Sequence, residues 1–276
     1  MSGKLYLVAT PIGNLDDITL RAIKCLKEVD LIAAEDTRHT LKLLNHLEIK
    51  KKLISYHRHN EEFKSTKLID FLLEGKNIAL VSDAGTPAIC DPGEDIVKQA
   101  IKNDIEIIPI PGACALINAL IASGIDTKEF SFYGFLPLNK RNRKNKLERI
   151  KEETKTIILY EAPHKLLNTL KDIQDILGEN VKICLAKELT KIHEKFMRGS
   201  IKEIIENLDD AKGEFIIIIE GKLNSNKEKD EIEDFTLDQL YEKLELEGLA
   251  KKEIIKQIAK IKKVNKNEIY QYFLNK

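Results

Sequence analysis

The residues in this sequence that are best suited to chemistry stand directly after short apolar runs. The clearest run covers 78–81, and it leads into Ser82 and Asp83 and then into a stretch of glycine and proline that ends at Gly93. Such a stretch forms neither helix nor central strand, so the run is expected to be a buried strand followed by a long, rigid turn. Asp83 then stands at the carboxyl end of a strand, where open α/β folds bind their ligands.

Charged and turn-forming residues follow other apolar runs in the same way. These groups lie at 11–14, 35–38, 111–113, 161–164 and 187–188. One such group by itself is ordinary turn chemistry. Several of them together, stiffened by proline and glycine, are typical of a preformed cleft for a small molecule.

Several familiar site motifs do not occur in the sequence. It has no G-x-G-x-x-G turn, no Walker A sequence and no G-x-S-x-G elbow, so the sites that depend on those motifs are excluded. His57 and His59 have no third ligand nearby in the sequence, and they are expected to lie in a solvated loop. The four cysteines are scattered and form no CxxC pair, so we expect reduced thiols and no metal site.

Composition bounds the class of protein. A chain of 276 residues with 43% hydrophobic residues predicts about two domains with real cores. The 45 basic and 45 acidic residues balance, so any surface for nucleic acid must be local. Neither a signal peptide nor a membrane span is expected. Together with the reduced cysteines, this predicts a cytoplasmic protein.

The elements that must position these residues alternate between strand and helix. Strands are expected at 5–9, 31–34, 53–56, 78–81 and 105–110, with helices between them, which predicts a mostly parallel sheet in a first α/β domain at 1–125. A second α/β domain at 126–223 has strands expected at 130–135, 156–160, 181–186, 195–197 and 215–219, the last of them central because it has no polar alternation. Residues 224–235 are interpreted as a linker, and 236–276 as a small helical, helix-turn-helix-like domain.

Eight motifs in this order resemble the tetrapyrrole methylase family. They are VATPIGNLDDITLRA, AAEDTR, HRHNE, SDAGTPAICDPG, IPGACA, FYGFLP, YEAPH and KELTK, and the similarity runs from about 4 to 222. Within the family, the sequences of these motifs resemble those of the branch that methylates ribosomal RNA. Tetrapyrrole methylases proper have a glycine-proline-glycine turn after the first strand, and here the sequence from Thr10 to Gly13 replaces it.

The resemblance implies a fold and a reaction. The fold would be two α/β domains with the cofactor cleft between them, and S-adenosylmethionine would be the cofactor. The reaction would be methylation of the ribose 2′-hydroxyl of a cytidine in the decoding region of 16S ribosomal RNA in the small ribosomal subunit. The resemblance also implies a homodimer. The methyl donor carries its own leaving group, so a single in-line displacement needs no metal, and holding the reacting atoms in line is the main task.

Site residues follow from the resemblance and from the charges at the strand ends. The resemblance implies that the cofactor would contact Pro11, Ser82, Asp83, Thr86, Cys114, Ala115, Glu214 and Phe215. The catalytic candidates are Arg38, Lys187 and Glu188, followed by Glu35 and His164. The alternative for Asp83 is a turn or helix-capping carboxylate, and for the catalytic candidates it is a salt bridge within a loop.

Two basic clusters are candidates for RNA contacts, because phosphate binding favours grouped Lys and Arg. The first lies at 136–151, which we interpret as the junction between the domains, and its candidates are Lys140, Arg141, Arg143 and Lys144. The second lies at 251–266 and contains only Lys as its basic residues. The alternative for each is a solvated helix face, and the helical tail could instead bind another subunit.

Two other functions stay open from the sequence. The first is an enzyme of the same fold that methylates a tetrapyrrole such as a precorrin, or a diphthamide intermediate. The second is an RNA-binding module without activity. The basic segment and the helical tail argue against a tetrapyrrole substrate, which needs neither.

Overall fold

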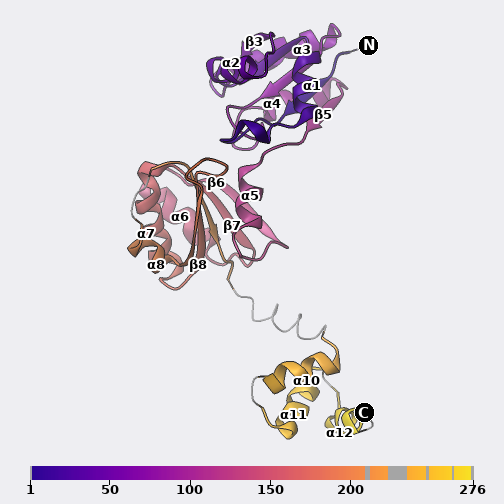
Figure 1. The fold of residues 1–276 in the computed structure, drawn as a ribbon, viewed down its shortest axis with the longest axis vertical. Coiled ribbons are helices and arrows are strands. Elements are labelled where there is room, and N and C mark those ends of the chain that lie inside the picture. The colour runs from indigo at the N-terminus through magenta and orange to yellow at the C-terminus, as the bar shows by residue number, and fades with distance from the viewer. Residues whose placement is uncertain (1, 209–211, 223–234, 247–248, 263, 275–276) are drawn as a thin grey trace. The chain divides into compact units, whose positions relative to one another are not determined.

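The computed structural model of the chain describes residues 2–208, 212–222, 235–246, 249–262 and 264–274 (Figure 1). The chain divides into two compact units, Met1–Glu220 and Gly221–Lys276. The first unit contains two five-stranded sheets, and helices from the second unit form a core of their own. No helix in the described part of the chain is long and apolar enough to cross a membrane.

The first sheet is parallel throughout, as the sequence predicted. Its order is β3-β2-β4-β1-β5, and Leu5 lies opposite both Ile78 and Ile107. The strands are β1 (Leu5–Val8), β2 (Leu31–Ala34), β3 (Lys52–Ser55), β4 (Ile78–Val81) and β5 (Ile107–Ile110).

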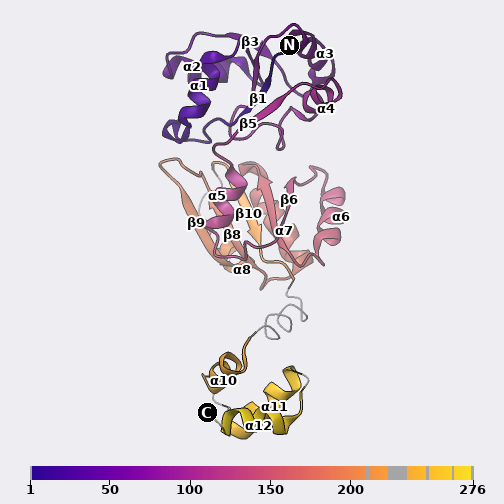
Figure 2. The same cartoon turned by 90° about the vertical axis from the view of Figure 1, so that its right-hand side faces the viewer.

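Helices cover both faces of this sheet (Figure 2). Helices α1 (Leu20–Glu28) and α2 (Thr37–His46) pack on the face that carries Ile32 and Ala34. Helices α3 (Glu61–Leu73) and α4 (Glu94–Lys102) pack on the opposite face, with Leu31 and Ala33. Neighbouring residues of β2 and of β4, all of them buried, therefore face opposite sides of the sheet, which is why these two strands are apolar without alternation.

The arrangement of connections sets the position of a ligand site. Strand β1 continues to α1 on one face of the sheet, and the adjacent β4 continues to α4 on the other face. The loops after these two strands therefore diverge, and the crevice between them is the topological switch point of the sheet.

The second sheet is mixed. Its order is β6-β7-β10-β8-β9, with β6 and β7 parallel and the other neighbours antiparallel. The prediction that 215–219 is central is confirmed, since β10 lies between β7 and β8 and all of its residues are buried. The strands are β6 (Phe130–Phe135), β7 (Thr156–Glu161), β8 (Lys182–Lys187), β9 (Lys195–Ser200) and β10 (Phe215–Ile219).

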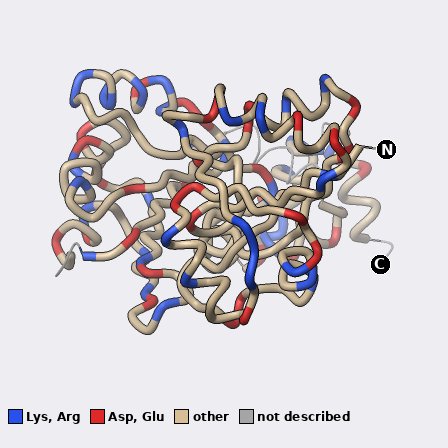
Figure 3. Tube along the Cα trace, turned by 90° about the horizontal axis from the view of Figure 1, so that it is seen from above, with Lys and Arg blue, Asp and Glu red and all other residues tan. Residues whose placement is uncertain are grey.

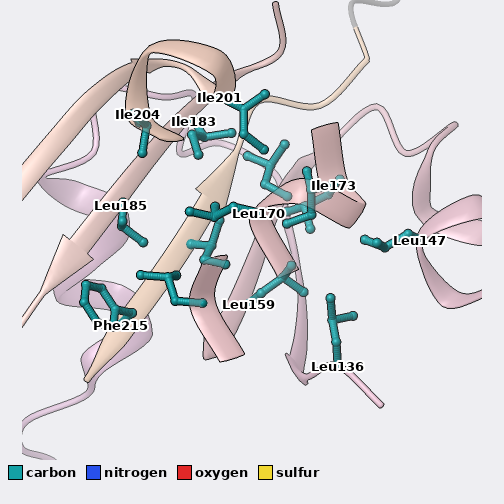
Figure 4. Close-up of a cluster of buried hydrophobic side chains, with 14 of the residues drawn as sticks. Leu136, Leu147, Leu159, Leu170, Ile173, Ile183, Leu185, Ile201, Ile204 and Phe215 are labelled. Carbon is teal, nitrogen blue, oxygen red and sulfur yellow. The ribbon is translucent and has the colours of Figure 1, made fainter. Parts of the chain in front are cut away.

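Three helices pack on one face of the second sheet and one on the other. The helices on the first face are α6 (Lys140–Ile150), α7 (Leu166–Leu177) and α8 (Ile201–Glu206). Each contributes side chains to the core there, among them Leu147, Leu170 and Ile204 in that order (Figure 4). The other face is covered by α5 (Ala115–Ile121), which follows β5 in the chain. The domain division at residue 125 stays a prediction, and α5, which it assigns to the first domain, packs on the second sheet.

The basic segment at 136–151 needs a correction. It is not a junction between the sheets, because most of it forms α6. This helix packs beside α7 on one face of the second sheet. Asn139 caps the first turn of this helix by accepting a hydrogen bond from the Asn142 N–H at 3.1 Å.

The described residues of the second unit contain three short helices, as predicted for 236–276. They are α10 (Leu237–Leu246), α11 (Lys251–Ile261) and α12 (Lys266–Leu274), and Leu240, Ile254, Ile258 and Ile269 form their core. The helix-turn-helix interpretation stays a prediction. Residues 224–234 of the expected linker and Lys263 of the second basic cluster lie outside the described residues.

Candidate functional site

The loops after β1 and β4 are joined at the switch point. The Thr10 N–H donates to the Gly85 carbonyl at 2.9 Å, and the Gly85 N–H donates back to the Thr10 carbonyl at 3.0 Å. Gly85 has φ +80, a backbone conformation in which a side chain is strained. The Thr10 hydroxyl also donates to the Ser82 carbonyl at 3.3 Å, so this crevice has rigid walls.

A cavity of about 430 Å³ opens beside this junction. One wall comes from the loops of the first sheet, and another comes from the carboxyl end of β7, the start of β10 and the loop after β8. Its volume lies in the range of roughly 300–1,000 Å³ that is usual for small-molecule and cofactor sites. We call it the larger cavity, because a smaller cavity of about 280 Å³ adjoins it. Its main lining residues are Ile12, Glu35, Asp83, Thr86, Asp91, Cys114, Ala115, Phe135, Tyr160, Leu189, Glu214, Phe215 and Ile216.

Carboxylates dominate the polar part of the larger cavity. Burial, and then the charge of Glu35, raises the pKa of Asp91 to about 6. Burial, and then the charge of Asp83, raises the pKa of Glu35 above its ordinary value. The Oδ1 of Asp83 accepts a hydrogen bond from the Asp36 N–H at 2.9 Å, which holds Asp83 toward the end of β2. The part of each rise that comes from a neighbouring carboxylate would be relieved by a positive charge in the cavity.

Aromatic and apolar groups form the opposite wall. The ring of Tyr160 meets those of Phe132 and Phe135 edge-on, with centroids 4.9 and 5.6 Å apart. The Tyr160 hydroxyl accepts a hydrogen bond from the Leu116 N–H at 3.2 Å. Burial raises the pKa of this hydroxyl well above its ordinary value, so it stays protonated.

The connection between the two sheets forms part of the cavity. Cys114 and Ala115 line it where the chain passes from β5 into α5. The Thr86 hydroxyl donates to the Ala113 carbonyl at 3.2 Å, which fixes the turn after β4 to this connection. A methyl group added to Gly13 would lie 2.6 Å from the Lys191 Cγ, so only glycine lets the loop after β1 approach the loop after β8 so closely.

The cofactor residues that the sequence analysis expected gather around the switch point. Asp83, Thr86, Cys114, Ala115, Glu214 and Phe215 line the larger cavity. Pro11 and Ser82 line a smaller cavity beside it. Their role as cofactor contacts stays a prediction. Sequence reasoning missed Asp91, Phe135 and Tyr160, although Asp91 lies in the same turn as Asp83.

The three catalytic candidates are held elsewhere. The Arg38 side chain is 88% exposed and pairs with Asp36 at 2.8 Å. The Lys187 Nζ lies 5.8 Å from the Phe215 ring centroid. Glu188 accepts hydrogen bonds from the Glu214 N–H at 2.8 Å and from Lys191 at 3.0 Å. None of the three lines either cavity as the described residues form them, so these positions fit the alternative of locally paired loop charges.

Of the two further candidates, only one reaches a cavity. Glu35 lines the larger cavity, whereas His164 lies beside Pro163, which does so, without lining either cavity of the described chain. Within the described residues, no group of three or more His, Cys, Asp or Glu is placed to hold a metal ion.

The RNA candidates on α6 divide into two kinds. Lys140 and Arg141 are exposed at its start, and Lys144 pairs with Asp175 at 3.1 Å. Arg143 is only 8% exposed, and its Nε and Nη2 donate to the Oδ2 of Asp172 at 2.8 and 2.6 Å. The assignment of Arg143 to an RNA surface is therefore wrong, because its guanidinium is committed to a buried ion pair.

Comparison with known proteins agrees with this fold. The model of the family "Tetrapyrrole (Corrin/Porphyrin) Methylases" matches residues 4–205. Ribosomal RNA small subunit methyltransferase I of Halalkalibacterium halodurans is 51% identical, over 98% of this chain and 94% of that one. The protein of the same name from Bacillus subtilis is 48% identical, over 98% of this chain and 94% of that one.

Among solved structures, the fold is similar to that of uroporphyrin-III-C-methyltransferase from Thermus thermophilus. The TM-score is 0.56 and the sequence identity 18%, over 80% of this chain and 94% of that one. At this identity the likeness concerns the fold alone. From the matched family model and the two close, full-length relatives, the chain belongs to the tetrapyrrole methylase family and, within it, to the ribosomal RNA small subunit methyltransferase I family.

Proposed function

We propose that this chain transfers a methyl group from S-adenosylmethionine to small-subunit ribosomal RNA, at the ribose 2′-hydroxyl of a cytidine in 16S RNA. The observation that carries the proposal is the carboxylate-lined cavity at the switch point of a methylase fold. The relatives named for ribosomal RNA are about half identical to this chain, whereas the porphyrin methylase shares only the fold. This favours an RNA acceptor over a tetrapyrrole.

The larger cavity fits a cationic donor. S-adenosylmethionine carries positive charge at its sulfonium and its ammonium group, and it supplies a methyl group with a neutral leaving group. Glu35, Asp83 and Asp91 repel one another when the cavity is empty of positive charge, and a cation between them would relieve that repulsion. Phe135 and Tyr160 offer ring faces and edges to an adenine.

The residues of this chain contribute orientation. The turn from Ser82 to Thr86, fixed to Thr10 and to Ala113, holds one side of the donor site. Ile12, Leu189 and Phe215 exclude water from the other side. Holding two reactants in line can remove about 7–11 kcal/mol from the barrier, which makes positioning the main contribution of such a site.

RNA contacts are proposed for exposed lysine and arginine on two helices. Lys140 and Arg141 are exposed on α6. Lys252, Lys256 and Lys260 follow one another at intervals of four on α11, so they share one face. Basic and acidic residues are otherwise interspersed along the described chain (Figure 3). Phosphate contacts supply most of the sequence-independent affinity for RNA.

The proposal is tested by mapping ribose methylation in 16S RNA by mass spectrometry. Small subunits from cells that lack the protein should lose one methylated cytidine, and the purified protein with S-adenosylmethionine should restore it. Unchanged methylation in those subunits would overturn the proposed acceptor. A cytoplasmic location, predicted from the scattered cysteines, and a homodimer, implied by the family resemblance, are part of the same proposal. Sedimentation equilibrium checks the dimer.

Asp83 provides the matching test of the donor site. Asp83→Ala removes both the charge and the acceptor for the Asp36 N–H, whereas Asp83→Asn keeps the acceptor and removes only the charge. We expect affinity for S-adenosylmethionine, measured by calorimetry, to fall at least about tenfold in both variants, since hydrogen bonds to charged groups contribute about 1.5–3 kcal/mol. Parent-like affinity in Asp83→Ala would show that the larger cavity is not the donor site.

A further inference from the structure

A second cavity, of about 280 Å³, adjoins the larger one. The two share a wall made of Ile12, Asp83, Ala84 and Glu214. The smaller cavity is otherwise bounded by the loop after β1, the first turns of α2 and Lys191 from the loop after β8. Groups held in the two cavities are therefore neighbours at these four residues.

The two cavities differ in charge. The lining of the larger cavity includes Glu35, Asp83, Asp91, Glu161 and Glu214, and no Lys, Arg or His among the described residues. Such a lining suits the cationic donor and disfavours a phosphodiester. The smaller cavity shares Asp83 and Glu214 with it and adds two basic side chains, His39 and Lys191. Lys191 is fixed there because its Nζ donates to Glu188 and Glu214, both at 3.0 Å.

The smaller cavity also contains an unpaired polar group. Thr40 lines it and is only 3% exposed, and its hydroxyl has no hydrogen-bond partner within the described structure. The backbone N–H of Thr40 donates to the Asp36 carbonyl at 3.0 Å, so the main chain of α2 is satisfied at this position. A buried hydroxyl without a partner has lost its hydrogen bond to water without a replacement, which destabilises the fold. That destabilisation is removed if a ligand supplies the partner.

We propose that the smaller cavity receives the sugar of the acceptor nucleotide, with the Thr40 hydroxyl hydrogen-bonded to it and Lys191 facing its phosphate. This inference rests on the proposed function, and it specifies which cavity holds which reactant. The ribose oxygen and the sulfonium methyl then meet directly where the two cavities adjoin, beside Asp83 of the shared wall, as an in-line displacement requires. The carbon–sulfur bond breaks with its electron pair going to sulfur, the oxygen–carbon bond forms, and the hydroxyl proton leaves to water or to a carboxylate of that wall.

The decisive variant is Thr40→Val. Valine keeps the shape of threonine, and because the hydroxyl has no partner in the structure, its removal leaves stability unchanged or raises it. We expect KM for small subunits from cells lacking the protein to rise about three- to tenfold, with affinity for S-adenosylhomocysteine unchanged. Thr40→Ser keeps a hydroxyl and should restore most of the lost kcat/KM. Both are measured with methyl-labelled S-adenosylmethionine, and thermal unfolding checks the fold of each variant.

The outcomes separate this inference from the proposed function. If the parent methylates small subunits and Thr40→Val has the same KM, or if Thr40→Val weakens S-adenosylhomocysteine binding as much as it weakens transfer, the acceptor assignment is overturned and the proposed function stands. If the parent binds S-adenosylhomocysteine but methylates no small subunits, both fail. Thr86→Val, in the larger cavity, is the matched control and should weaken S-adenosylhomocysteine binding.

Discussion

Among the carboxylates that line the larger cavity, Glu35, Asp83 and Asp91 lie close enough to affect one another, and this gives the site its chemical character. Burial raises the pKa of Glu35 and of Asp91, and each is affected by another carboxylate of the group. The nearby guanidinium of Arg58 lowers both pKa values without reversing either shift. A cation in the cavity would neutralise the negative charge of these carboxylates that Arg58 leaves uncompensated.

Donor binding should therefore depend on pH near 6. Because the pKa of Asp91 is raised to about 6, lower pH protonates this carboxyl and removes its attraction for a sulfonium. Affinity for S-adenosylmethionine should fall as pH decreases from 7 to 5, by up to about tenfold per pH unit. Calorimetry measures this, and Asp91→Asn should flatten the profile. A parent affinity that is constant over this range would contradict the assignment.

The same shift predicts the opposite trend for stability without ligand. The folded pKa of Asp91 lies above that of the unfolded chain, so its stabilising proton is fully bound below about pH 4 and is lost as pH rises through about 6. Asp91→Asn should remove this part of the pH dependence of unfolding. Donor affinity and ligand-free stability thus change in opposite directions over one pH range.

The catalytic candidates show that local pairing of charged side chains could not be predicted from the sequence. Arg38 and Glu188 stand at strand ends, as catalytic groups often do, but each is paired within a few residues or by the adjacent strand. Asp36 accepts a hydrogen bond from the Arg38 N–H at 2.8 Å and caps α2, which begins at Thr37. Local capping of this kind depends on backbone geometry that residue types alone do not specify.

At the scale of elements, α6 shows how a basic segment can be part of a core. The predicted strands agree closely with those observed because short, continuous apolar runs are typical of strands in a sheet that is covered on both faces. The segment at 136–151 was misjudged because its charges conceal Leu147 and Ile150, which are buried at a spacing of three. Arg143 lies on the same side and brings its charge into the interior with Asp172.

Replacing Arg143 should destabilise the second sheet strongly. Arg143→Met leaves the Asp172 carboxylate, which is 5% exposed, without its main partner. Loss of one partner of a buried ion pair costs about 3–5 kcal/mol, and Lys144, 3.5 Å from the other Asp172 oxygen, should keep the effect near the lower limit. Urea unfolding measures the difference, with the exposed Lys140→Met as control, expected within about 0.5 kcal/mol. Equal stability of the two variants would refute this account of α6.

At the scale of the whole molecule, overall charge is balanced and the candidate RNA contacts are local. The lysine face of α11 points away from the core residues Ile254 and Ile258 of the same helix. Lys140 and Arg141 belong to the other unit. The proposed RNA contacts therefore fall into two groups, one on each unit, that can be changed separately.

Charge reversal can distinguish these groups. Lys140→Glu with Arg141→Glu, and separately Lys252→Glu with Lys256→Glu and Lys260→Glu, should weaken binding to small subunits. For every phosphate that is no longer neutralised, the salt slope of log K should decrease in magnitude by about 0.7–0.9. Reversal of Lys27 and Lys102, exposed on the first sheet's helices, is the control. A helix whose reversal leaves both affinity and salt slope at control values has only a solvated face.

The path from β5 to α5 has a consequence for how the first unit responds to its donor. Cys114 and Ala115 belong both to the only short covalent path from the first sheet to the second in the described residues and to the wall of the larger cavity. Any molecule held there contacts both sheets and their tether at once. A donor bound there stabilises the folded state of both sheets together. Saturation with donor should therefore raise the midpoint of the melting transition of residues 1–220 and also narrow that transition.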